Sequence, residues 1–196
     1  MGIRDMNGIS SKIYTRRGDR GETRLLSGEK VKKDDLRVKT YGSLDELQSH
    51  LGVALSLARN EAVSSICLGI QDDIFLASSE LASTPGTLSR LKRRIGEKDV
   101  GRLEDSIDAL TSFHGQPSRF VVPIMSQASA MLNVARAVCR RCERLLVTLN
   151  RQTSEYRELI VYFNRLSDLL FMLAWSLEVK AVVENIVHDL IENAPG

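Results

Sequence analysis

Apolar residues recur three or four positions apart through most of this chain. From Ser43 the segment "SLDELQSHLGVALSLARN" opens with Ser-x-x-Glu, the pattern of a helical capping box, and apolar residues then follow at helical spacing. The same spacing recurs over 61–83, 97–113, 126–150 and 154–192. The pattern predicts an all-α protein whose five amphipathic helices, joined by short connections, form an antiparallel bundle.

An irregular segment precedes these helices. The stretch "YTRRGDRGETRLLSG" is rich in arginine and glycine, and Gly18-Asp-Arg-Gly21 has too much glycine for a helix interior. We therefore expect one domain, 1–196, in which an N-terminal loop segment, 1–41, precedes the helical bundle, 42–192. Backbone N–H groups in such a loop are free to bind an anion, although a generic basic loop has the same composition. Neither a Walker A spacing nor a dinucleotide fingerprint is present.

The fourth predicted helix has a charged face beside its apolar stripe. In "VARAVCRRCERLLVTL", Arg136, Arg140, Glu143 and Arg144 recur at helical spacing. Periodicity alone favours a solvated face with ion pairs. The alternative is an anion site, because planar guanidinium groups donate in pairs to phosphate oxygens.

Two polar residues interrupt the apolar stripe of the fifth predicted helix. Asn164 and Asp168 lie one helical turn apart in "YFNRLSDLLFMLAWSLE". Polar groups beside apolar surface need hydrogen-bond partners or a cavity. We expect them either to pair with the arginines of the fourth helix or to contact a ligand.

Composition limits the partners and the location. The 27 basic and 25 acidic side chains leave a net charge of +2, which argues against nucleic acid binding by the whole surface. No run of about 18 apolar residues exists, so we expect no membrane span. The three cysteines favour a reducing compartment, the cytoplasm, over a disulfide framework. Cys139 and Cys142 have no second pair, so we interpret them as small buried helix residues rather than zinc ligands.

Several segments together resemble one family. They occur in order through most of the chain: the loop Thr-x-x-Gly-Asp-x-Gly, the Tyr-Gly-x-x-Asp-Glu-Leu run, "RFVVP", the Arg-x-x-x-Arg-Arg-x-Glu-Arg helix, and Asn-Arg-Leu-Ser-Asp. In this combination they closely resemble the ATP:cob(I)alamin adenosyltransferases of the propanediol-utilisation (PduO) type. The resemblance implies an enzyme that moves the 5′-deoxyadenosyl group of ATP to the Co(I) centre of a corrinoid, giving adenosylcobalamin and triphosphate.

The resemblance also implies an assembly and a set of site residues. The enzyme would be a homotrimer with ATP, Mg²⁺ and the corrinoid, cob(I)alamin or a relative, bound between subunits. A corrinoid reductase and a cobalamin-dependent acceptor enzyme would be its partners. The loop residues expected to hold ATP are Thr15, Arg16, Arg17, Gly18, Thr23 and Lys33. Those expected from the neighbouring subunit are Arg140, Arg141, Glu143, Arg144 and Asn164. Those expected to act in catalysis are Arg140, Asp45 paired with Arg136, and Phe120 below the corrin ring.

One departure from the family pattern lies on the corrinoid side. Members usually follow the Phe-x-x-Pro run with two glycines, whereas Pro123 is followed here by Ile124 and Met125. The loss of flexible backbone predicts altered corrinoid binding. Two alternatives therefore stay open at this point. One is a catalytically impaired bundle that binds ATP or a corrinoid, and the other is an interaction bundle whose arginine face binds acidic partners or RNA.

Overall fold

A computed structural model describes residues 14–117 and 125–192. Within these ranges the elements are two short strands, five long helices and one short helix. In chain order they are β1 (Glu22–Arg24), β2 (Lys30–Lys32), α1 (Leu36–Ala58), α2 (Glu61–Leu81), α3 (Pro85–Leu88), α4 (Glu97–His114), α5 (Gln127–Thr153) and α6 (Arg157–Glu192). The predicted all-α fold with five main helices is confirmed.

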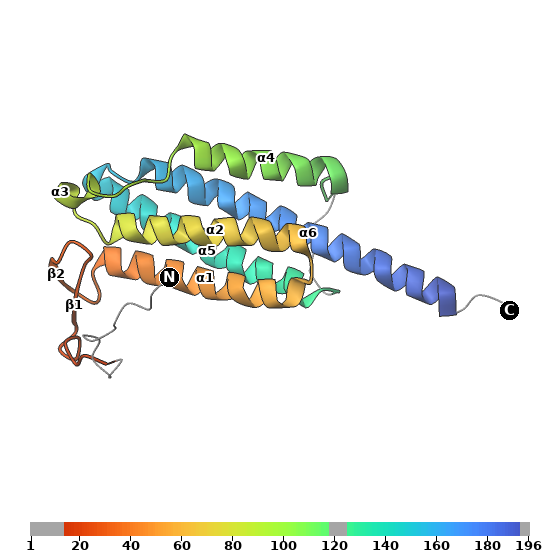
Figure 1. The fold of residues 1–196 in the computed structure, drawn as a ribbon, viewed down its shortest axis with the longest axis horizontal. Helices are drawn as coiled ribbons and strands as arrows, with labels where there is room; N and C mark the ends of the chain where they lie inside the picture. The colour runs from red at the N-terminus through yellow and green to blue at the C-terminus, as the bar shows by residue number, and fades with distance from the viewer. Residues whose placement is uncertain (1–13, 118–124, 193–196) are drawn as a thin grey trace, which may run out of the picture.

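Successive long helices run in alternate directions (Figure 1). α1 packs against α2 and α5, and α6 packs against α5 and α4. The β1–β2 hairpin lies at one end of the bundle, and the last turns of α6 extend beyond the other helices at the opposite end (Figure 1). Among the described residues, no helix is both long and apolar enough to cross a membrane.

The first helix begins earlier than the sequence pattern predicts. α1 starts at Leu36, where the carboxylate of the preceding Asp35 accepts the backbone N–H of Arg37 at 2.8 Å. The predicted start at Ser43 is therefore wrong: its capping-box pattern occurs inside a helix that an aspartate cap has already begun. As a result, α1 runs across the expected boundary between residues 41 and 42.

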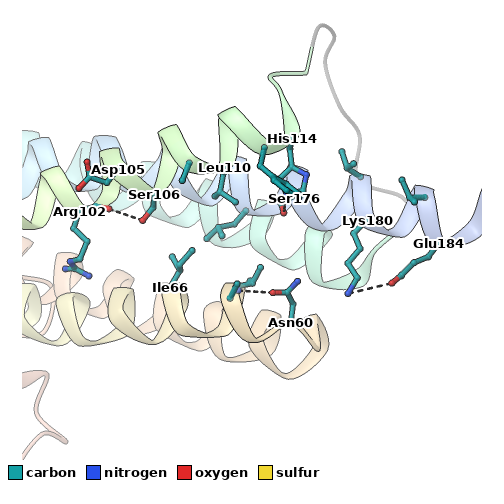
Figure 2. Close-up of a pocket in the computed structure, with 17 residues that line it drawn as sticks. Asn60, Ile66, Arg102, Asp105, Ser106, Leu110, His114, Ser176, Lys180 and Glu184 are labelled. Atoms are coloured by element: carbon teal, nitrogen blue, oxygen red, sulfur yellow. Dashed lines mark hydrogen bonds and ion pairs between the residues drawn. The ribbon is translucent and has the colours of Figure 1, made fainter.

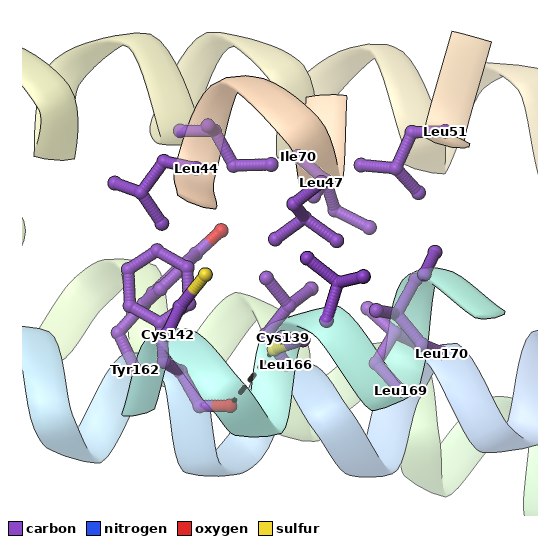
Figure 3. Close-up of a cluster of buried hydrophobic side chains, with 14 of the residues drawn as sticks. Leu44, Leu47, Leu51, Ile70, Cys139, Cys142, Tyr162, Leu166, Leu169 and Leu170 are labelled. Carbon is purple, nitrogen blue, oxygen red and sulfur yellow. Dashed lines mark hydrogen bonds between the residues drawn. The ribbon is translucent and has the colours of Figure 1, made fainter. Parts of the chain in front are cut away.

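Apolar side chains from the five long helices meet in one core, and Figure 3 shows part of it, from α1, α2, α5 and α6. α1 contributes Leu44, Leu47 and Leu51, and each is fully buried. The predicted stripe of α5 is confirmed, since all its members are at most 3% exposed: Leu132, Ala135, Cys139, Cys142, Leu146 and Leu149. Cys139 donates its thiol to the backbone carbonyl of Phe163 at 3.3 Å. The cysteines are therefore packing residues, as the sequence indicated.

A polar network joins three helices at the edge of this core. The carboxylate of Asp73, on α2, accepts hydrogen bonds from the Tyr162 hydroxyl of α6 at 2.7 Å and from Arg102 of α4 at 2.5 Å. Arg93 adds a longer contact at 3.4 Å. Asp73 is 3% exposed and Tyr162 is fully buried. The network therefore fixes how α2 and α4 lie over α6.

Candidate functional site

Glycine shapes the loop that precedes the hairpin. β1 and β2 pair antiparallel, with Thr23 opposite Val31, and the chain enters β1 through Gly21 at φ +78°. The carbonyl of Gly21 accepts the backbone N–H of Lys33 at 2.8 Å. A Cβ at Gly18 would lie 3.0 Å from the Lys33 amine, so a larger residue here would require this lysine to shift by a few tenths of an ångström.

These residues line a cavity of about 890 Å³ at the hairpin end of the bundle. Its lining is Thr15, Arg16, Arg17, Gly18, Asp19, Arg20, Glu22, Thr23, Arg24, Lys30 and Lys33. Six of these side chains are cationic and two are acidic, and Glu22 is already paired with Lys30. The guanidinium of Arg24 donates to the carbonyl of Gly28 at 2.9 Å. The cavity, which we call the loop cavity, therefore has an excess of positive charge. All six loop residues predicted to hold ATP line it.

A second cation-lined cavity lies on α5. It measures about 320 Å³ and is lined by Arg140, Glu143, Arg144, Val147, Thr148 and Arg151. We call it the α5 cavity. Glu143, its one acidic residue, accepts a hydrogen bond from the side-chain amide of Asn164 at 3.1 Å. The structure thus brings together four residues of the predicted second half of the site: Arg140, Glu143, Arg144 and Asn164.

Other predicted residues have different surroundings. Arg141 is not in the α5 cavity, because its guanidinium pairs with Glu46 of α1 in the same chain. Asp168 pairs with Arg165 of its own helix at 3.5 Å. Within residues 14–117 and 125–192 of one chain, neither Asn164 nor Asp168 pairs with an arginine of α5, so this chain alone does not support that interpretation of the two residues.

The predicted corrinoid-side residues are only partly described. Asp45 is exposed on α1, and Arg136 lies half-buried on α5 with its guanidinium 5.8 Å from the ring centre of Phe171. The Nε atom of Arg136 is buried and has no hydrogen-bond partner within the described ranges. Those ranges show no ion pair between Asp45 and Arg136, so the pair stays a prediction. Phe120 and Ile124 lie outside the described residues.

A cavity larger than the loop cavity and the α5 cavity lies elsewhere (Figure 2). It measures about 970 Å³ and is bounded by α2, α4 and α6. Figure 2 shows Ile66 and Leu110 in its wall, with Lys180 and Glu184 paired at one end. None of the described residues that the sequence predicts for the site lines this cavity. The predicted site residues that line a cavity therefore line the smaller, cation-rich ones and not this one.

Sequence reasoning missed several residues of the two charged cavities. Arg20, Arg24 and Lys30 line the loop cavity, and Thr148 and Arg151 line the α5 cavity. Helical spacing was a usable signal for the α5 pair, since 148 and 151 follow Arg140 by 8 and 11 positions. In the loop no such spacing exists, and only the hairpin pairing brings Lys30 beside Arg24.

Fold and site together define a class: a helical-bundle protein with two cation-lined cavities suited to a polyphosphate. A family model described as cobalamin adenosyltransferase matches residues 13–177. The chain belongs to the cobalamin adenosyltransferase family. The prediction that it is an enzyme of the corrinoid adenosyltransferase class is confirmed.

Three relatives illustrate this membership. A corrinoid adenosyltransferase of Citrobacter freundii is 44% identical over 163 residues, which cover 83% of this chain and 93% of the relative. The corrinoid adenosyltransferase PduO of the same organism is 37% identical over 180 residues, 92% of this chain, but the chain spans only 54% of that relative. A solved variant of the PduO-type ATP:corrinoid adenosyltransferase from Lactobacillus reuteri, complexed with cobalamin and ATP, matches with a TM-score of 0.77. It is 34% identical, and the match covers 86% of this chain and 91% of that one.

Proposed function

We propose that this chain transfers the 5′-deoxyadenosyl group of ATP to the Co(I) centre of a corrinoid. The C5′–O bond of ATP breaks, its electron pair leaves with triphosphate, and the electron pair of Co(I) forms the new Co–C bond. Cobalt is thereby oxidised from Co(I) to Co(III), so no other oxidant is required. The observation that carries the proposal is the loop cavity, with its six cationic side chains, in a member of this family.

The loop cavity is the proposed ATP site. Arg16, Arg17 and Lys33 supply positive charge to the phosphates, while Thr15 and Thr23 supply hydroxyl groups. Gly18 allows the lysine amine to lie against the backbone, 3.0 Å from where a Cβ would be. Preorganised donors of this kind stabilise the charge that develops on triphosphate as it leaves.

We propose that the α5 cavity completes this site from a neighbouring copy. The two cavities of one chain share no lining residue, so one chain presents two separate halves. If the copies form a ring, the loop cavity of each copy can meet the α5 cavity of the next, and every ATP site is then complete. From the family resemblance we propose that this ring is a homotrimer. Arg140 and Arg144 would then contact ATP, with Glu143 held in place by Asn164.

The ion pair of Arg141 suggests a different role for that residue. Its guanidinium is held by Glu46 on the neighbouring helix of the same chain. We propose that Arg141 fixes α5 against α1 and so sets the direction of the arginines on the adjacent face, rather than binding ATP itself.

On the corrinoid side we propose that Asp45 pairs with Arg136 of a neighbouring copy. The buried Nε of Arg136 lacks a partner within the described part of the chain, and Asp45 is exposed. A buried guanidinium N–H without a partner is unfavourable, so a carboxylate from another copy is a suitable acceptor. Phe120 would lie beneath the corrin ring and exclude an axial ligand of cobalt.

Catalysis then needs no general base, since Co(I) is itself the nucleophile. The protein must hold C5′ in line with cobalt, stabilise the leaving triphosphate and exclude water. Arg140 stabilises the leaving triphosphate, because a guanidinium donates two parallel hydrogen bonds to phosphate oxygens.

Magnesium fits the site as a companion of the phosphates. Mg²⁺ is usually bound by one or two carboxylates together with substrate phosphates. The loop cavity includes Asp19 and Glu22, and Glu22 is paired with Lys30. Asp19 is therefore the carboxylate we propose for the ion, which would neutralise phosphate charge when bound.

We also propose a cytoplasmic location, supported by three free and fully buried cysteines, Cys67, Cys139 and Cys142. Because Co(I) must be generated and the product used, we propose a corrinoid reductase and a cobalamin-dependent acceptor enzyme as partners.

The test is to mix the full-length protein with ATP, Mg²⁺ and chemically reduced cobalamin and to follow the spectrum of adenosylcobalamin. Arg140→Ala should lower kcat/KM by about 100-fold, the scale for a lost charge-stabilising donor. Arg59→Gln is the matched control, because Arg59 is exposed at the end of α1 far from the hairpin (Figure 1). No conversion by the wild type, or full activity of Arg140→Ala, contradicts the proposal.

A further inference from the structure

The α5 cavity extends beyond the residues assigned above. Val147, Thr148 and Arg151 line it together with Arg140 and Arg144. On a helix, positions 140, 144, 148 and 151 fall within one narrow face, since residues three, four, seven and eleven apart lie close in angle. The guanidinium of Arg151 is therefore the third on this face, and it lies in the last turn of α5. This end of α5 lies at the hairpin end of the bundle (Figure 1).

The charges of this face are not balanced by the chain itself. Between residues 14–117 and 125–192 no ion pair involves Arg140, Arg144 or Arg151. The single acid of the cavity, Glu143, accepts its hydrogen bond from Asn164. Several arginines elsewhere on the bundle are paired, by contrast: Arg94 with Glu80 at 2.9 Å, Arg102 with Asp73 at 2.5 Å and Arg165 with Glu104 at 2.7 Å. Three unpaired guanidinium groups in one cavity suit an anion with several charged groups.

Spacing separates the third arginine from the first two. Eleven residues from Arg140 to Arg151 span about 16 Å of helix, and the four residues from Arg140 to Arg144 span about 6 Å. Because the three guanidinium groups start from positions spread along the helix, a chain of phosphates can contact more of them at once than a single phosphate group can. The hydroxyl of Thr148, between Arg144 and Arg151, donates to the carbonyl of Arg144 at 3.0 Å and so leaves its oxygen able to accept.

We propose that Arg151 binds the terminal phosphate of ATP and of the triphosphate product, and so selects a triphosphate over shorter phosphate chains. This inference rests on the proposed function, because it takes Arg140 and Arg144 as ATP contacts. A purely structural explanation exists: Arg151 lies in the last turn of α5, where a cation interacts favourably with the helix dipole. That explanation predicts a change in stability but none in the recognition of phosphate chain length.

The test compares wild type, Arg151→Gln, Arg151→Lys and the control Arg59→Gln in the assembled full-length protein. The first readout is adenosylation of reduced cobalamin, where Arg151→Gln should raise KM for ATP about tenfold, with a much smaller effect on kcat. Arg151→Lys should recover part of this loss, because it restores the charge without the planar fork.

The second readout uses inorganic tripolyphosphate and pyrophosphate as probes, measured by calorimetry and by inhibition. Arg151→Gln should weaken tripolyphosphate binding about tenfold and leave pyrophosphate binding unchanged, whereas Arg59→Gln should change neither. Equal binding of tripolyphosphate by wild type and Arg151→Gln overturns the inference, and so does an equal loss for both probes.

These outcomes separate the inference from the proposed function. If the wild type adenosylates cobalamin and Arg140→Ala does not, while Arg151→Gln matches the wild type, the inference fails and the function stands. If the wild type does not adenosylate cobalamin, the function fails, and the difference between the two probes still tests Arg151. Melting temperatures and circular dichroism of the variants show whether each remains folded.

Discussion

Replacing Asp73 by alanine tests whether the polar network fixes α2 and α4 over α6. Asp73 is 3% exposed, and its carboxylate accepts a hydrogen bond from the buried Tyr162 hydroxyl at 2.7 Å. Arg102 and Arg93 add ion pairs at 2.5 and 3.4 Å, and both arginine side chains are about half exposed. The substitution removes all three contacts and leaves the tyrosine hydroxyl buried without a partner.

The expected loss in the free energy of unfolding follows from how deeply these groups are buried. A hydrogen bond to a charged group contributes about 1.5–3 kcal/mol, and an orphaned buried hydroxyl adds to the loss. The two arginine contacts contribute less, about 0–1 kcal/mol each, because solvent screens half-exposed guanidinium groups. Asp73→Ala should therefore lower the free energy of unfolding by about 2–4 kcal/mol. Tyr162→Phe should cost about 1 kcal/mol, because the carboxylate keeps its arginines.

Urea unfolding, monitored by circular dichroism at one fixed protein concentration, measures both losses. The control is Asp72→Ala, because Asp72 is the exposed neighbour of Asp73 on α2 and should change stability by less than about 0.5 kcal/mol. A double-mutant cycle of Asp73→Ala with Tyr162→Phe should give a coupling energy of about 1 kcal/mol or more. If Asp73→Ala matches Asp72→Ala, or the coupling is zero, the network does not hold these helices together.

Three further predictions concern stability, pH and assembly. Glu80 is 1% exposed and accepts the N–H of Ile95 at 2.6 Å and Nε of Arg94 at 2.9 Å. Glu80→Ala should therefore cost about 2–3 kcal/mol in the same urea assay, and a cost below about 0.5 kcal/mol contradicts this account. Burial raises the pKa of Cys67 and of Cys142 to about 12 from the usual 9.0. The unfolded chain loses these protons first, so stability is fully present below pH 9 and falls toward pH 12, by up to about 1.4 kcal/mol per unit for each thiol. When Cys67 and Cys142 are both replaced by valine, the melting temperature should fall less steeply between pH 9 and pH 12 than it does in the wild type. Equal slopes in the two proteins argue against the burial effect. Finally, specific activity should disappear on dilution to the monomer, as judged by sedimentation; an active monomer contradicts a site shared between copies.

The bundle is predictable because burial imposes a period on the sequence. The α5 stripe from Leu132 to Leu149 recurs at helical spacing and is buried as predicted. The grouping of charged residues in the α5 cavity is predictable for the same reason, since spacing along one helix decides which residues share a face. That is why Arg140, Glu143 and Arg144 were expected together and line one cavity.

Contacts between elements are not predictable in this way. The pattern at Ser43 matches a capping box, but the helix already begins at Leu36 because Asp35 caps it. Arg141 lies one residue from Arg140, yet its guanidinium turns to Glu46 on another helix. Such pairing depends on which helices pack together and in which register, and a local sequence pattern contains neither.

The distribution of charge explains why composition alone pointed away from a polyanion. The net charge of +2 is a small difference between 27 basic and 25 acidic side chains. Some of them meet as ion pairs across the bundle, such as Arg94 with Glu80. The excess is concentrated instead in the loop cavity, with six cations and two acids, and in the α5 cavity, with three guanidinium groups and one acid. Like charges held this close repel one another, and a bound polyphosphate relieves the repulsion. A ligand that binds only the folded chain stabilises it by mass action, so ATP, which we propose binds these two surfaces, should stabilise the folded chain.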